Sequence, residues 1–240
     1  MRTAVLVTLL AALAAPAEAR WERPTDPSEA DIEAARALYE RGLASIDALR
    51  WDEALAAFEE AYARSGVGAA LYNVAVSLRA LGRHVEARDA GEQLLREHAE
   101  LDPALRADAE RLVREERARV AVLLLEGLPR DPRPEVRLDG RLATDDGERP
   151  LRLDVDPGAH TLFVTAPGCR VFEWRGTLEE GAHRSIAIEL APLPSGDGTA
   201  EAAIAVVGAL VAAGVAAAVV GWALWDADEI EPMGAQVIRL

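Results

Sequence analysis

The sequence predicts an α+β multidomain chain with a module of helical hairpins, a small antiparallel β-sandwich and a C-terminal single transmembrane helix. Two observations predict this order. The spacing of apolar residues changes at Val120 from about 3.6 to 2, which are the periods of helices and strands. No charged residue occurs in the 24 positions from Ala202 to Trp225. As a helix this stretch is roughly 36 Å long, and a bilayer's hydrocarbon core is about 30 Å thick.

Composition limits the classes of partner. The chain has 240 residues and a net charge of −15, which leaves room for about two small domains. Nucleic acid and anionic lipid headgroups are disfavoured because both are polyanions. Cys169 is the only cysteine, which excludes an internal disulfide framework and a cysteine-based zinc site. Its thiol is either a reactive or intermolecular group or a small buried apolar side chain.

Residues 1–19 are typical of an export signal. Arg2 forms a short basic region, Ala4 to Ala15 an apolar region, and Ala17-Glu18-Ala19 a cleavage site of the A-x-A type. The alternative is a buried N-terminal helix. The three-part pattern favours a signal peptide that is removed after export.

Residues 28–102 have a helical pattern. Ser28 and Asp31 are spaced as in an N-terminal capping box. The helical pattern is interrupted near Arg50, at Ser65-Gly66 and at Gly82-Arg83, which divides the segment into four short helices. Helices of this kind pack as antiparallel hairpins.

The same segment contains an internal repeat with an offset of 33 residues between Ala54 and Ala87. It resembles the tetratricopeptide repeat, whose period is about 34 residues. Gly42 and Phe58 stand where that family places small and aromatic packing residues, whereas Gly91 replaces the aromatic residue in the second unit.

The resemblance implies a groove, lined by the first helix of each hairpin, that binds a protein or peptide. Asn73 matches an asparagine that holds peptide backbone in peptide-binding members of the family. Alternatively, Tyr39 and Tyr72 fill space between helices. The predicted partner-binding residues are Arg36, Tyr39, Tyr72, Asn73, Val76 and Arg79.

Residues 103–119 predict a further helix that caps the repeats. Pro103 suits a first helical turn, and a narrow apolar stripe comprises Leu105, Ala109, Leu112 and Val113. Arginines alternate with acids on the other positions, which indicates a solvated face rather than a basic patch.

Residues 120–192 predict about six short strands that form an antiparallel sandwich. Asp139-Gly140 is a hairpin turn signal, and Asp156-Pro157-Gly158 is a second turn. The run DPGAHTLFVTAPG, with VRLDG before it, resembles the PEGA family of small bacterial surface and envelope domains. That resemblance implies a β-domain that binds or spaces components of the cell wall or surface.

We predict a linker at residues 193–200, the membrane span at 202–225 and a cytoplasmic tail at 226–240. Trp222 and Trp225 suit the membrane interface. Gly208, Gly214 and Gly221 belong to small-xxx-small spacings, which permit two membrane helices to pack closely. Packing of the span through these glycines is therefore a hypothesis. The alternative is a buried soluble helix. The flanking charges do not orient the span, and the export signal places the bulk of the chain outside the cytoplasmic (inner) membrane.

These patterns favour a non-enzymatic, membrane-anchored envelope protein that presents both modules in the periplasm. No nucleophile motif, phosphate-binding loop or paired histidines occurs in the sequence, so no catalytic residue, cofactor or metal site is predicted. The alternatives are a structural or assembly subunit that works through its membrane helix, and a periplasmic sensor. Deleting 202–240 distinguishes the groove from assembly through the helix.

Overall fold

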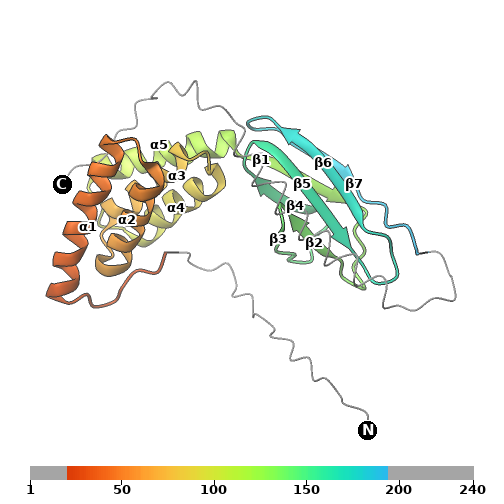
Figure 1. Cartoon of the computed structure of the whole chain (residues 1–240), viewed down its shortest axis with the longest axis horizontal. Coiled ribbons are helices and arrows are strands. Elements are labelled where there is room, and N and C mark those ends of the chain that lie inside the picture. Colours follow the sequence, from red (N-terminus) through yellow and green to blue (C-terminus); the bar gives the residue numbers. More distant parts are fainter. Residues whose placement is uncertain (1–20, 194–240) are drawn as a thin grey trace, which may run out of the picture.

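The computed structural model describes residues 21–193. Within that range, five helices are followed by seven strands, and the two groups lie side by side (Figure 1). The chain is therefore α+β, as the sequence predicts. We call residues 29–119 the helical module and residues 121–187 the β-module. The helices are α1 (Glu29–Asp47), α2 (Trp51–Ser65), α3 (Gly68–Ala80), α4 (His84–Glu97) and α5 (Pro103–Arg119).

Each helix packs against the next one along the chain, from α1 to α5, and α3 also contacts α5. The first helix begins with the expected capping box. The Ser28 hydroxyl accepts a hydrogen bond from the Asp31 N–H, and the Ser28 N–H donates one to the Asp31 carboxylate, each 3.2 Å long. Both groups are otherwise unpaired donors at a helix start, so this local exchange fixes where α1 begins.

Two glycines permit close helix contacts in this module. A Cβ on Gly42 would lie 2.6 Å from the Phe58 ring, so glycine is needed for α1 to pack on α2. A Cβ on Gly91 would lie 2.7 Å from Val113 Cγ2. Where the repeat pattern predicts an aromatic residue in place of Gly91, a side chain of α5 packs directly against α4 instead.

The segment that precedes α1, residues 21–27, lies across the helices, and we call it the strap. Trp21 is buried, its indole Nε1 donates to the Glu59 carboxylate at 3.1 Å, and its carbonyl accepts from Gln93. Arg23 donates to the Glu97 carbonyl at 3.0 Å. The strap therefore joins α2 and α4, which the sequence pattern does not predict.

The strands form two sheets that share one apolar core. The strand order is β4-β1-β7 in one sheet and β3-β2-β5-β6 in the other. β1 pairs with β7 in parallel, which corrects the expectation of an all-antiparallel sandwich. A period of two is the same for both directions of pairing, so the sequence pattern could not distinguish them. The strands are β1 (Ala121–Glu126), β2 (Glu135–Leu138), β3 (Arg141–Leu142), β4 (Leu151–Val155), β5 (Gly158–Thr165), β6 (Phe172–Leu178) and β7 (His183–Ala187).

The turn between β2 and β3 has the predicted type. Asp139 and Gly140 both have positive φ, 50° and 79°, as a type I′ hairpin turn requires. β3 itself is only two residues long and was not predicted.

Several predicted segments lie outside the described residues. They are the signal peptide (1–19), nearly all of the linker (193–200), the membrane span (202–225) with Gly208, Gly214 and Gly221, and the tail (226–240). Among residues 21–193, no helix has the length and apolar character needed to cross a membrane.

Candidate functional site

Two of the predicted groove residues form a buried pair between α1 and α3. The Asn73 amide nitrogen Nδ2 donates a hydrogen bond of 2.9 Å to the Tyr39 hydroxyl. The Tyr39 ring packs edge-on against Phe58, with 5.3 Å between the ring centroids. Burial raises the pKa of Tyr39 to about 12, although the bond from Asn73 acts in the opposite direction. Both side chains thus contribute to the packing of the helical module.

Tyr72, which precedes Asn73 on α3, and Val76, about one turn after it, are also buried, with exposed fractions of 4% and 3%. Burial raises the pKa of Tyr72, and the nearby Asp108 adds to this effect, while Arg79 and Arg111 oppose it. Asp108 and Arg111 belong to α5. Tyr72 therefore lies beside α5, the helix predicted to cap the repeats.

The two predicted arginines differ in their surroundings. The Arg79 guanidinium contacts two carboxylates of α5, those of Glu115 at 2.9 Å and Glu116 at 2.8 Å. The Arg36 side chain on α1 is 75% exposed, and its nearest ionic partner is Glu33 at 3.7 Å. Of the six predicted residues, only Arg36 is open to a partner without rearrangement, and partner binding by the others stays a prediction.

A buried charge cluster, not predicted from the sequence, joins α3, α4 and α5. Glu116 has no exposed area, and its carboxylate lies 2.8 Å from Arg79 Nε and 2.6 Å from His84 Nδ1. A carboxylate removed from water is costly unless it is paired in this way. The cluster therefore holds α5 against α3 and α4.

The sequence did contain a signal for this cluster. Glu116 lies four residues after Leu112 and seven after Ala109, so it continues the apolar stripe of α5 at helical spacing. The sequence interpretation treated it as part of the solvated face. A charge in register with an apolar stripe predicts a buried ion pair instead.

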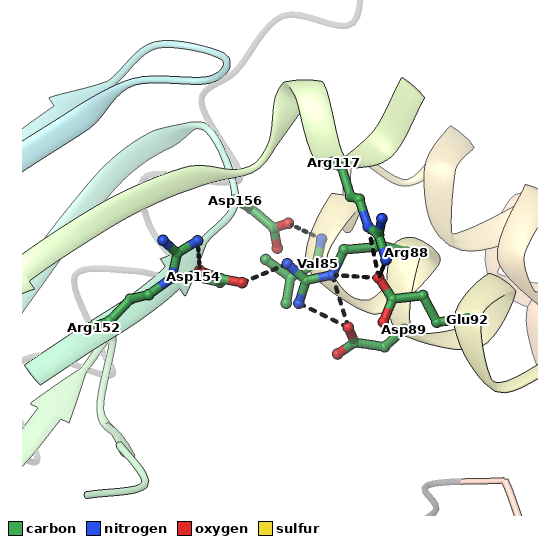
Figure 2. Close-up of polar contacts among 8 residues, drawn as sticks. All are labelled: Val85, Arg88, Asp89, Glu92, Arg117, Arg152, Asp154 and Asp156. Carbon is green, nitrogen blue, oxygen red and sulfur yellow. Dashed lines mark hydrogen bonds and ion pairs between the residues drawn. The ribbon is translucent and has the colours of Figure 1, made fainter. Parts of the chain in front are cut away.

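A carboxylate of the β-module caps a helix of the helical module. Helix α4 begins at His84 and has no side-chain cap of its own. Asp156, in the turn between β4 and β5, accepts a hydrogen bond of 2.7 Å from the Val85 N–H (Figure 2). An acceptor with negative charge is favourable at a helix N-terminus, where N–H groups lack partners.

Arg88 lies beside this cap and bridges the two modules. Its guanidinium donates to Asp154 of β4 and to Asp89 of α4 (Figure 2). Arg152 also contacts Asp154, at 2.8 Å. Burial lowers the pKa of Arg88, but the carboxylates of Asp89 and Asp154 outweigh this effect and raise it. The side chain is only 15% exposed, so this bridge is better shielded than an ordinary surface pair.

The C-terminus of α5, at the same end of the helical module as the start of α4, is capped as well. Only Val120 separates α5 from β1. The Gly181 N–H, in the turn between β6 and β7, donates to the Arg119 carbonyl at 2.8 Å. Gly181 has φ +65°, and a Cβ there would lie 2.7 Å from the Ala118 carbonyl oxygen. Glycine is needed because of both the conformation and the close approach.

We call these contacts the junction, with Val85, Arg88, Arg119, Asp154, Asp156 and Gly181 as its residues. They join the two modules through directional hydrogen bonds and ion pairs. Within residues 21–193, no group of His, Cys, Asp and Glu side chains is arranged to hold a metal ion. No family model matches the chain, and no curated protein matches it significantly.

Proposed function

We propose that this chain is a non-enzymatic envelope protein that presents a helical interaction module and a β-module as one rigid unit. Residues 202–225 anchor it in the cytoplasmic membrane, and both modules lie on the periplasmic side. The resemblances to tetratricopeptide repeats and to PEGA domains support a protein or peptide partner for the first module and a cell-wall or surface component for the second.

The junction is the observation that carries this proposal. A flexible linker would let two modules act separately, but here one residue separates α5 from β1. Asp156 and Gly181 of the β-module cap the ends of α4 and α5. An arrangement of this kind is suited to holding two binding surfaces at a constant spacing.

Anchoring adds a second contribution. A protein confined to a membrane meets other membrane-bound or wall-bound partners at a raised effective concentration. Weak contacts by each module then suffice for stable association, provided that the geometry lets both engage together. Rigid spacing and membrane anchoring therefore support the same role of presentation.

The surface around Arg36 is the test site for the helical module. Arginine is enriched among residues that anchor interfaces, and Arg36 is the exposed member of the predicted set. The matched control is Arg175 of β6, whose side chain is 70% exposed.

The experiment is crosslinking of the full chain in membranes, followed by affinity purification, with wild-type, Arg36→Glu and Arg175→Glu chains. The proposal predicts that Arg36→Glu loses at least one crosslinked protein that both other chains retain. Identical partners for all three chains would contradict binding at this surface.

A chain that lacks 202–240 distinguishes the alternative role. If the shortened chain still binds the same partner in solution, the folded modules carry the interaction. If binding is lost while the modules stay folded, assembly through the membrane segment is supported instead. Protease accessibility in intact spheroplasts tests the location, because the proposal requires both modules to be digested from outside.

A further inference from the structure

His160 connects two turns of the β-module. It lies on β5, where its ring nitrogen Nδ1 is 2.7 Å from Asp139 Oδ2. The other ring nitrogen, Nε2, is 2.7 Å from the backbone carbonyl oxygen of Asp156. The ring thus spans from the type I′ turn between β2 and β3 to the turn between β4 and β5.

Both neighbours of the ring are acceptors. A backbone carbonyl oxygen and an ionised carboxylate can only accept hydrogen bonds, so each ring nitrogen must carry a hydrogen to satisfy them. Only the imidazolium form has two N–H groups. A neutral ring would leave one nitrogen lone pair facing an oxygen at 2.7 Å, so one of the two contacts would be lost.

The Asp139 side is held in place by its own contacts. The second carboxylate oxygen of Asp139 accepts a bond of 2.9 Å from the Thr161 N–H, and the Asp139 N–H donates to the Thr161 carbonyl. Asp139 therefore has little freedom to follow a ring that moves. A carboxylate is also a stronger acceptor than a backbone carbonyl, so a neutral ring keeps its one N–H for Asp139 and loses the contact to Asp156.

Asp156 is also the residue that caps α4. Its carbonyl oxygen contacts His160, while its carboxylate accepts the Val85 N–H at 2.7 Å. The ring of His160 thus contacts a residue of the junction directly. The proton on His160 and the contact between the modules share Asp156.

We propose that His160 is a proton-dependent latch, in which the imidazolium form holds the Asp156 turn in the position that caps α4.

The charges around the ring are consistent with this assignment. Those that act on it come from Asp139 in the β2–β3 turn and from Asp156 in the β4–β5 turn. On β6, the residue paired with His160 is the uncharged Gly176. Across the junction, α4 contributes Arg88, which is paired with Asp154, and His84, which is paired with Glu116.

The direction of the pH effect follows from these contacts. Burial lowers the pKa of His160, but the bonds to Asp139 and Asp156 outweigh it and leave the pKa raised above its usual 6.5. The contribution of a group with a raised pKa is complete below 6.5 and is lost as the pH rises through the folded-state value. The latch is therefore closed in mildly acidic surroundings and opens toward alkaline pH.

Amide hydrogen exchange of the full chain, measured at pH 6 and pH 8.5 and corrected for intrinsic rates, tests the latch. The probe is the Val85 amide, because its hydrogen is donated to Asp156 and α4 has no side-chain cap of its own among residues 21–193. In the wild-type chain we expect its protection to fall about tenfold at the higher pH, as for loss of one charge-assisted hydrogen bond. His160→Gln should give the lower protection at both pH values.

The matched control is His183→Gln, since His183 is an exposed histidine on β7 and this variant should behave like the wild type. If His160→Gln keeps the full pH dependence, a group other than His160 causes it and the proposal is overturned.

A second measurement uses only the wild-type chain, so it does not depend on whether a variant folds. Nitrogen NMR of the His160 ring in the wild-type chain should show both ring nitrogens protonated at pH 6. A neutral ring at that pH would equally overturn the proposal.

Discussion

The interior of the helical module and its junction with the β-module are built from different interactions. The interior contains fully buried side chains such as Phe58, Leu71 and Leu94. The junction instead contains partly exposed charged groups, of which Arg88 and Asp154 are examples. Burial of apolar surface is strong but has no preferred direction, whereas caps and arginine–carboxylate contacts are directional. We infer that the interior determines stability and the junction determines geometry.

This division gives each region its own measurable response. A substitution in the interior should change the free energy of unfolding strongly. A substitution in the junction should change that free energy little and widen the range of orientations between the modules. Three substitutions, in decreasing order of expected effect, examine this difference, and a change of pH then examines the β-module alone.

The largest effect is expected for Phe58→Ala. Phe58 has no exposed area, and truncation of a buried phenylalanine costs about 3–5 kcal/mol. The free energy of unfolding by urea, followed by circular dichroism, measures the loss. The control is Leu142→Ala at an exposed position of β3, for which a change of no more than about 0.5 kcal/mol is expected. Equal losses in the two variants would contradict our account of the core.

Glu116→Ala should cost about 3 kcal/mol, because it leaves Arg79 and His84 without their buried carboxylate partner. Glu110→Ala on the exposed face of the same helix is the control, with an expected change within about 0.5 kcal/mol. The same urea titration applies. A small effect for both would show that the buried cluster does not hold α5 in place.

Asp156→Ala should cost about 1 kcal/mol, the usual value for a lost helix cap. Ser28→Ala removes a cap that lies within the helical module and should cost about the same. The two variants should then differ only in how they affect the orientation of the two modules. Spin-label distances between the modules should broaden for Asp156→Ala and remain unchanged for Ser28→Ala. Broadening in both, or in neither, would argue against a special role for the junction.

The change of pH examines a group within the β-module, Asp145. Hydrogen bonds from Arg149 are the main cause that lowers the pKa of Asp145 to about 2. A lowered pKa contributes stability at neutral pH that is lost as the pH falls from about 4 toward 2. Asp145→Asn should flatten this part of the pH profile of unfolding. An unchanged profile would contradict the assignment.

Local features were predictable from the sequence. The capping box at Ser28, the helix at Pro103–Arg119 and the turn at Asp139-Gly140 all appear as expected. Each is set by residues close together in the chain, whose conformational preferences act directly on the backbone.

Contacts between distant segments were not predictable in this way. The bond from Val85 to Asp156 joins residues 71 positions apart, and that from Trp21 to Glu59 joins residues 38 apart. No local pattern selects such pairs. The tetratricopeptide and PEGA resemblances concern modules taken one at a time, so they carry no information about how two modules meet.

The sequence of α3 also indicates that the predicted groove residues on it are buried. Helix α3, GAALYNVAVSLRA, has small or apolar residues on nearly every side, and all residues from Gly68 to Leu78 are buried. A helix without a polar face is usually buried all round. This composition, rather than the repeat positions, indicated that Tyr72 and Val76 contribute to packing.

The most direct test of the central claim is the distribution of distances between the two modules. Spin labels at Arg41→Cys on α1 and Arg175→Cys on β6, both exposed positions, would be placed in a full chain that carries Cys169→Ser. Double electron–electron resonance should give a single narrow distribution for this chain, and a broad one after Arg88→Ala and Asp156→Ala are added. A broad distribution before those two substitutions would contradict a rigid junction.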